Sequence, residues 1–176
     1  MMRIAVSGTH GVGKTTLAEE LCAHLPGHEL IPEPYFLLEE QDYEFGHPPS
    51  PADYAVQLRY STRLLPAAGP AVVFDRSPLD FLAYLNTFGA DPEATIDLAA
   101  VRSALATLDL LVLLPVTETV DRVLPAAEMP GLRAEMDAAL ADLVFADPFD
   151  LVGELQVVEL NIPLEHRVST VLGALG

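Results

Sequence analysis

The chain of 176 residues is 51% apolar, which is typical of one globular domain, residues 1–176, built around a single large core. Its formal charge of −17 excludes a broad nucleic-acid footprint, because a protein of this sign repels the phosphate backbone. The single cysteine excludes an internal disulfide, and no apolar run approaches the roughly 20 residues of a membrane span, so we expect a cytoplasmic protein with no membrane partner.

The first third of the sequence predicts two strands and two helices. Residues 3–7 form a short apolar run that is typical of a buried strand, and residues 16–25 have the periodicity of an amphipathic helix. A second short strand is expected within 28–34. A polar connection containing prolines at 47–51 then leads into a helix over 52–65.

The rest of the sequence continues this alternation. Three further strands are expected at 71–77, 108–116 and 155–160. Further helices are expected at 78–88, 93–108 and 134–145, with a terminal helix from about 164. Because strands and helices alternate, we predict an α/β fold with a five-stranded parallel sheet that helices cover on both faces.

The turn after the first strand has the spacing G-x-x-x-x-G-K-T of a phosphate-binding loop, or P-loop. The candidate nucleotide-binding residues are Gly8, Thr9, His10, Gly11, Val12, Gly13, Lys14, Thr15 and Thr16. Glycines let successive N–H groups point at phosphate oxygens, and the following helix adds its positive end. Lys14, the only lysine in the chain, would reach the β- and γ-phosphates, and Thr15 would ligate Mg²⁺. An ordinary glycine-rich turn is the alternative.

The charged residues after the third strand bear on the reaction. Asp75 ends that strand where a second metal-binding carboxylate is expected. Arg76 takes the place where many motor ATPases carry an acid that activates water, and a single lysine makes the guanine-reading Asn-Lys-x-Asp sequence impossible. Both observations disfavour a motor or a GTPase switch. The alternatives are a helix N-cap for Asp75 and a strand-end ion pair for Arg76, with an acid such as Asp80.

Three stretches together resemble the P-loop nucleoside and nucleotide kinases: GTHGVGKTT at 8–16, IPEP at 31–34 and FDRSPLDFLAYL at 74–85. This group includes deoxynucleoside kinases, thymidylate kinases and the AAA-type domain related to ribosylnicotinamide kinase. The resemblance covers roughly the first half of the chain. It implies a three-layer α/β/α P-loop NTPase fold with strand order 2-3-1-4-5, ATP and Mg²⁺ as cofactors, and a small-molecule acceptor.

The resemblance also implies roles for two residues near the reacting phosphate. Glu33, followed by Pro34, matches the carboxylate that takes the proton from an acceptor hydroxyl. Arg76 would hold the acceptor oxygen or an acceptor phosphate, while Asp75 orients a metal-bound water. A solvated loop carboxylate is the alternative for Glu33.

A lid is expected at about 117–133, after the fourth strand, with Arg122 and Arg133 as its catalytic arginines. Surface charges on a helix are the alternative for both arginines. The acceptor is expected between the Glu-Pro segment and the helix over 52–65. Besides Glu33 and Arg76, the candidate acceptor-binding residues are Tyr35, Gln57, Arg59 and Arg63.

These residues together predict an ATP-dependent kinase that transfers the γ-phosphoryl group to a hydroxyl or phosphate of a small, nucleoside-like molecule. The alternative is a nucleotide-binding regulatory protein, similar to an ATPase or GTPase, that has no phosphoryl acceptor. The sparse lid favours this alternative, whereas the combination of Glu-Pro and Asp-Arg-Ser favours the kinase. The sequence does not decide whether the protein is a monomer or a homodimer.

Overall fold

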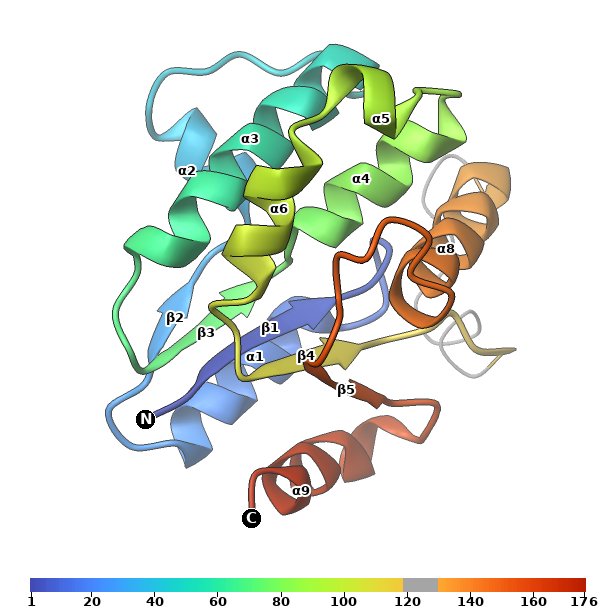
Figure 1. Cartoon of the computed structure of the whole chain (residues 1–176). Helices are drawn as coiled ribbons and strands as arrows, with labels where there is room; N and C mark the ends of the chain where they lie inside the picture. Colours follow the sequence, from blue (N-terminus) through green and yellow to red (C-terminus); the bar gives the residue numbers. More distant parts are fainter. Residues whose placement is uncertain (119–129) are drawn as a thin grey trace.

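The computed structural model describes residues 1–118 and 130–176. It contains a five-stranded sheet of order β2-β3-β1-β4-β5, in which every neighbouring pair is parallel (Figure 1). The strands are β1 (Arg3–Ser7), β2 (Glu29–Ile31), β3 (Val72–Asp75), β4 (Leu110–Leu113) and β5 (Gln156–Glu159). The predicted α/β class and strand order are therefore confirmed.

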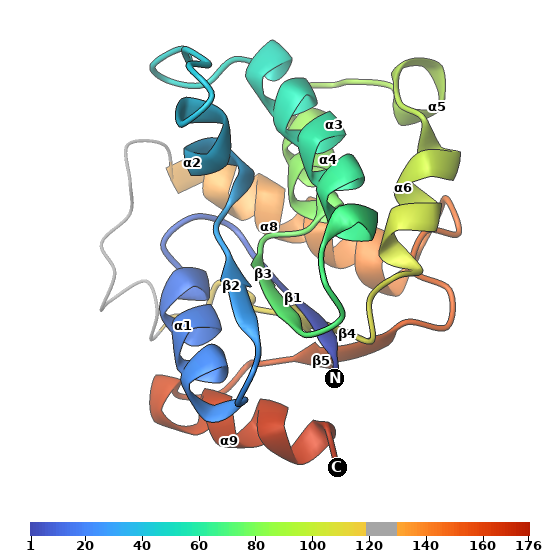
Figure 2. The ribbon, with the colours of Figure 1, turned by 90° about the vertical axis from the view of Figure 1, so that its left-hand side faces the viewer.

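Helices cover the sheet on both faces, as Figure 2 shows. One layer consists of α1 (Lys14–His24) and α9 (Leu164–Ala174). The other consists of α3 (Pro51–Ala67), α4 (Pro78–Thr87), α6 (Leu98–Leu105) and α8 (Pro130–Phe145). The alternation of side chains along β1 explains the two cores: Ile4 and Val6 are buried with α1 and α9, whereas Ala5 is buried on the opposite face.

Two short helices differ from the elements expected from the sequence. The structure forms α2 (Pro34–Glu39), where only a polar connection was expected. Proline favours this start, because its fixed φ suits the first turn of a helix and its missing N–H needs no partner there. The helix expected over 93–108 is divided into α5 (Pro92–Thr95) and α6, because the Asp97 side chain accepts from the Ala100 N–H and caps a new helix.

Arg3 anchors the amino edge of the sheet, where β1 begins. Its Nη1 donates to the carbonyl oxygens of Ala68 (2.8 Å) and Gly69 (2.6 Å), and its Nη2 donates to that of Leu65 at the end of α3. Its Nε donates to the Thr107 carbonyl at 2.7 Å, beyond the end of α6. The last carbonyls of a helix have no partner within the helix. One guanidinium therefore ties the ends of two helices to the first strand.

In the described parts of the chain, none of the helices combines the length and the apolar character that a membrane crossing needs.

Candidate active site

The P-loop joins β1 to α1 through backbone positions that only glycine fits well. Gly13, directly before α1, has φ 88°, in the left-handed region that other side chains disfavour. At Gly8, a Cβ would lie 2.7 Å from the carbonyl oxygen of Leu114, closer than such atoms approach. These two glycines therefore let the loop curve tightly over the carboxyl edge of the sheet.

Lys14 is buried at the start of α1, with 6% of its surface exposed. Its Nζ donates to the Thr9 carbonyl oxygen at 2.7 Å, so the loop backbone holds the ammonium group. Burial and the neighbouring Arg76 charge lower the pKa of Lys14 to about 8, although nearby carboxylates oppose the shift. An anion bound in the loop would favour the charged form of this lysine.

Thr15 and Asp75 meet beside Lys14. The Thr15 Oγ1 donates to Asp75 Oδ2 at 2.6 Å. The other carboxylate oxygen, Oδ1, is buried and has no hydrogen-bond partner among the described residues. Burial raises the pKa of Asp75, against the opposing effects of Thr15 and Lys14. A hydroxyl next to a carboxylate with an unused oxygen fits Mg²⁺, which prefers oxygen ligands and usually takes only one or two carboxylates beside substrate phosphates.

No group of three or more His, Cys, Asp or Glu side chains within residues 1–118 and 130–176 is arranged to hold a metal ion. The Thr15 and Asp75 pair therefore fits a metal that arrives with the nucleotide phosphates rather than one held by the protein alone.

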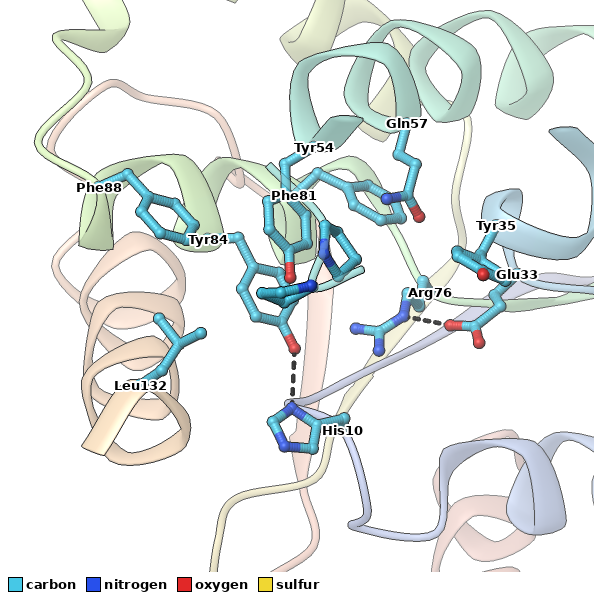
Figure 3. Close-up of a pocket in the computed structure, with 12 residues that line it drawn as sticks. His10, Glu33, Tyr35, Tyr54, Gln57, Arg76, Phe81, Tyr84, Phe88 and Leu132 are labelled. Atoms are coloured by element: carbon cyan, nitrogen blue, oxygen red, sulfur yellow. Dashed lines mark hydrogen bonds and ion pairs between the residues drawn. The ribbon is translucent and has the colours of Figure 1, made fainter. Parts of the chain in front are cut away.

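Glu33 and Arg76 come together at the carboxyl ends of two neighbouring strands. Glu33 precedes α2, just after β2, and Arg76 directly follows β3. The Arg76 Nε donates to Glu33 Oε2 at 2.5 Å (Figure 3). Arg76 has φ 86°, a conformation that costs about 1–3 kcal/mol for a residue with a side chain and that is concentrated at functional sites.

Asp80 holds the other side of Arg76. The Arg76 Nη1 lies 3.3 Å from Asp80 Oδ1 and 3.2 Å from the Gly8 carbonyl oxygen. Asp80 is fully buried and accepts hydrogen bonds from Ser7 Oγ (2.7 Å), the Gly8 N–H (2.9 Å) and the Ser77 N–H (2.9 Å). Asp80 therefore positions both the first glycine of the P-loop and Arg76. The ion pair of Arg76 with Asp80, the alternative considered for Arg76 from the sequence, is thus present. The contact of Asp80 with the P-loop was not predicted, although the capping box Ser77-x-x-Asp80 is a sequence signal for its inward position.

The ion pair sets the charge states of its two members. Burial alone would raise the pKa of Glu33, but the charge and hydrogen bond of Arg76, together with Lys14, hold it below its ordinary value. Burial opposes the charge of Arg76, but Glu33 and Asp80 outweigh it and raise the pKa of the guanidinium. Glu33 is therefore ionised and Arg76 is protonated at neutral pH.

A cavity of about 310 Å³ opens beside this ion pair. In Figure 3 Glu33, Tyr35 and Arg76 lie on one side of it, and Gln57 projects from α3. A wall of aromatic rings faces them, with Tyr54 stacked on Tyr84 at 4.4 Å between centroids and 5.8 Å from Phe88. The predicted acceptor residues Glu33, Arg76, Tyr35 and Gln57 therefore share one pocket.

His10 also lines this pocket, although the sequence analysis assigned it to the nucleotide. Its Nδ1 forms a hydrogen bond of 3.2 Å with Tyr84 Oη. Burial, followed by the charges of Arg76, Arg133 and Lys14, lowers the pKa of His10, so its imidazole is neutral at pH 7. His10 thus connects the P-loop to the aromatic wall.

Arg59 and Arg63, two further predicted acceptor residues, do not line this pocket. They line a separate hollow, together with Ile96 and Asp97. Each helical residue advances by about 100°, so Arg59 and Arg63 project from α3 about 160° and about 120° away from Gln57. Proximity in sequence therefore does not place the three side chains on one face of the helix.

The two predicted lid arginines have different outcomes. Arg122 lies outside the described residues, as does most of the predicted lid at 117–133. Arg133, on α8, is buried with 4% of its surface exposed, and its Nη2 donates to the Gly11 carbonyl oxygen at 3.1 Å. Arg133 is therefore a neighbour of the P-loop rather than a charge on the helix surface.

Arg167, on α9, is a further neighbour of the P-loop that the sequence analysis missed. It is 2% exposed, and its Nη1 donates to the Val12 carbonyl oxygen at 2.7 Å. A sequence signal exists, because Arg167 lies one helical turn before the fully buried Val171 and therefore on the apolar face of the helix. Four cationic side chains thus each donate a hydrogen bond to a different carbonyl oxygen of the P-loop: Arg76 to Gly8, Lys14 to Thr9, Arg133 to Gly11 and Arg167 to Val12.

A family model described as an AAA domain matches residues 3–153. The chain belongs to this AAA domain family. No curated protein sequence matches it. Among solved structures, the AAA domain resembles deoxyadenosine kinase from M. mycoides with bound dATP, with 16% identity, a TM-score of 0.62 and 99% coverage of both chains.

Two further solved structures are similar to the AAA domain. The M. mycoides deoxyadenosine kinase with the products dCMP and dCDP has 16% identity, a TM-score of 0.65 and coverage of 99% of this chain and 98% of that one. The NadR protein in complex with NR has 22% identity and a TM-score of 0.63, and covers 98% of this chain but 51% of that chain. The AAA domain thus spans about half the length of that NadR chain. At these identities the likeness shows a shared P-loop kinase-like fold.

Proposed function

We propose that this AAA domain is an ATP-dependent phosphotransferase, which moves the γ-phosphoryl group to a hydroxyl or phosphate of a small, nucleoside-like molecule. The observation that carries this proposal is the Glu33–Arg76 ion pair, which lies between the P-loop and an adjoining cavity. A protein that only hydrolysed ATP would need no second cavity next to the transferred phosphate.

The donor side of the site binds and orients the triphosphate. Backbone N–H groups of the P-loop and the start of α1 provide hydrogen-bond donors, and Lys14 supplies a buried positive charge. Thr15 and Asp75 would hold Mg²⁺, which neutralises charge on the phosphates when it is bound. Arg133 contacts the loop from α8 and adds a positive charge close to the phosphates.

The acceptor side supplies a base and a fixed positive charge. Glu33 Oε2 is bonded to Arg76, but Oε1 has no hydrogen bond from the described residues. Oε1 takes the proton of an acceptor hydroxyl while the hydroxyl oxygen forms a bond to the γ-phosphorus. The bond between the γ-phosphorus and the oxygen that bridges it to the β-phosphate breaks, and ADP leaves. Arg76 stays fixed by Gly8 and Asp80 and stabilises the developing negative charge.

The shape of the pocket supports a nucleoside-like acceptor. The stacked rings of Tyr54 and Tyr84 provide a flat apolar wall, and Gln57 carries an amide that can both donate and accept. The similar structures contain deoxynucleotides in the deoxyadenosine kinase and NR in NadR. The ligands of these similar structures support a nucleoside-like acceptor for this chain.

The test is acceptor-dependent transfer from γ-labelled ATP, screened over nucleosides, nucleoside monophosphates and simple alcohols. We expect a labelled product with at least one nucleoside-like acceptor, and Glu33→Gln should lower kcat roughly 10²-fold or more without changing ATP affinity. The matched control is Glu29→Gln, an exposed carboxylate at the start of β2, the strand that leads to Glu33. ATP turnover that no acceptor stimulates would instead support the regulatory alternative.

A further inference from the structure

Arg167 is a buried cation that uses only part of its hydrogen-bonding capacity. Its Nη1 donates to the Val12 carbonyl oxygen at 2.7 Å, but its Nε and Nη2 are buried and have no hydrogen-bond partner among the described residues. None of the ion pairs within residues 1–118 and 130–176 includes Arg167. A buried charge without a paired anion is costly, so the unused donors point to a missing ligand.

The position of Arg167 identifies the kind of ligand. The side chain projects from the first turn of α9 toward the first turn of α1, and a Cβ on Gly13 would lie 3.5 Å from its Nη1. Arg167, Gly13 and Thr16 line a cavity of about 430 Å³ between these two helices. The positive end of α1 favours an anion at this place. A guanidinium with two unused N–H directions fits phosphate oxygens better than any other common biological anion except a carboxylate.

Within residues 1–118 and 130–176, no carboxylate forms an ion pair with Arg167. Glu20 and Glu165 line the same cavity, yet neither forms an ion pair with Arg167. The P-loop beside Arg167, in contrast, has the backbone geometry of a phosphate site, with Gly13 in the left-handed conformation before α1. The missing anion is therefore a phosphate group of the nucleotide that the loop binds.

The direction along the loop decides which phosphate this is. Arg76 contacts the carbonyl of Gly8, at the end of the loop that faces Glu33 and the acceptor cavity. Arg167 contacts the carbonyl of Val12, at the opposite end of the glycine loop. The transferred γ-phosphate belongs next to Glu33, so Arg167 faces the phosphates that stay on the donor.

We propose that Arg167 is a phosphate-binding residue of the donor site and that its Nε and Nη2 bind the non-transferred α- or β-phosphate. This inference rests on the proposed function, because it assumes that the P-loop binds the donor nucleotide. It makes the terminal helix α9 part of the nucleotide site, since Arg167 holds the loop through Val12 and the ligand through its other nitrogens.

The test measures binding of ADP, ATP, pyrophosphate and adenosine by calorimetry in the wild-type protein, Arg167→Met and Arg167→Lys. Arg167→Met should weaken ADP and ATP by a similar factor of about 10- to 100-fold, because both carry the α- and β-phosphates, and should leave adenosine unchanged; a loss for pyrophosphate as well assigns the contact to the β-phosphate. Arg167→Lys should lose less affinity, since lysine keeps the positive charge but not the planar set of N–H donors of the guanidinium. Arg102→Met is the matched control: Arg102 also donates to backbone carbonyls, those of Phe149 and Asp150, but is exposed.

Three results would overturn the proposal. ADP binding within about twofold of wild type in both Arg167 variants would show that the residue only supports the fold. An equal loss of binding for adenosine, which carries no phosphate, would place the contact on the nucleoside. Absence of ADP and pyrophosphate binding in the wild-type protein would remove the donor site itself. Failure of acceptor-dependent transfer, with these binding results as expected, would overturn the proposed function and leave Arg167 as a phosphate-binding residue.

Discussion

Arg3 and Arg167 are both arginines that donate to backbone carbonyls, but they lie at opposite edges of the sheet and differ in how much of the side chain is used. Every guanidinium nitrogen of Arg3 has a partner: Nε and Nη2 on Thr107, Nη1 on Ala68 and Gly69, and Nη2 also on Leu65. Only Nη1 of Arg167 has one among the described residues.

The same contrast holds for other polar groups at the two edges. At the carboxyl edge, Thr9 Oγ1 and Asp75 Oδ1 are buried without hydrogen-bond partners among the described residues. Parallel sheets bind ligands outside the carboxyl ends of their strands, where loops and helix N-termini converge. At the amino edge, Arg3 is therefore fully paired and His28 Nδ1 is a buried unpaired atom among the described residues, whereas the carboxyl edge keeps several polar groups unpaired around the P-loop.

The largest expected effect comes from removing Lys14, the buried lysine at the carboxyl edge. Lys14→Ala should weaken ATP binding by roughly 10²- to 10³-fold, because it deletes a buried charge from the phosphate site. Calorimetric titration with ATP measures the loss. The unfolding midpoint should not fall, since the substitution removes a buried ammonium whose one hydrogen bond within the described part of the chain goes to the Thr9 carbonyl. ATP affinity within about twofold of wild type would contradict a functional carboxyl edge.

The converse substitution tests the amino edge. Arg3→Met keeps the apolar stem but removes the donors for Leu65, Ala68, Gly69 and Thr107, so it should destabilise the protein by about 2–3 kcal/mol. Chemical denaturation measures this change. Arg102→Met, which removes two carbonyl bonds from an exposed arginine, should cost less than about 1 kcal/mol. ATP affinity should be unchanged in both variants, and a loss in Arg3→Met would show that the two edges are coupled.

The sequence predicted the parts of the site that depend on local order. The glycine loop, Lys14 and Thr15 form one short motif, and strand–helix alternation was enough to predict a parallel sheet with helices on both faces. The resemblance to nucleoside and nucleotide kinases also implied roles for Glu33 and Arg76 near the same phosphate, and the two side chains form an ion pair.

The missed residues depend on helix faces and on packing between distant segments. Arg167 is far from the P-loop in sequence, and only the packing of α9 against α1 brings it to Val12. Arg59 and Arg63 show the opposite case, since they are close to Gln57 in sequence but project from another face of α3. Sequence spacing fixes the angles between these side chains, but only the packing of α3 on α4 and the sheet shows which face of the helix lines the cavity.

The smallest predicted effect is a pH dependence of ADP binding at the carboxyl edge, which arises from Lys14. Of the four cations that contact the P-loop, Lys14 has a pKa lowered to about 8 by burial, which means that the empty site partly loses this charge above that pH. Bound phosphate favours the protonated form, so ADP affinity should be constant below about pH 7 and should fall by up to about tenfold per pH unit above about pH 8. Lys14→Arg, which keeps its charge, is the control and should show a flatter profile.

Stability should change with the opposite sign over the same range. The unfolded chain binds the Lys14 proton with the ordinary pKa of 10.5, whereas the folded, ligand-free protein binds it with a pKa of about 8. Between these values the unfolded state holds more protons, so the contribution of Lys14 to the free energy of unfolding rises with pH. Subtracting the denaturation profile of Lys14→Arg from that of the wild type isolates this contribution. If the difference in the free energy of unfolding falls or stays flat from about pH 8 to about pH 10, Lys14 is not held as a buried charge. The carboxyl edge would then carry no greater cost of unpaired charge than the amino edge.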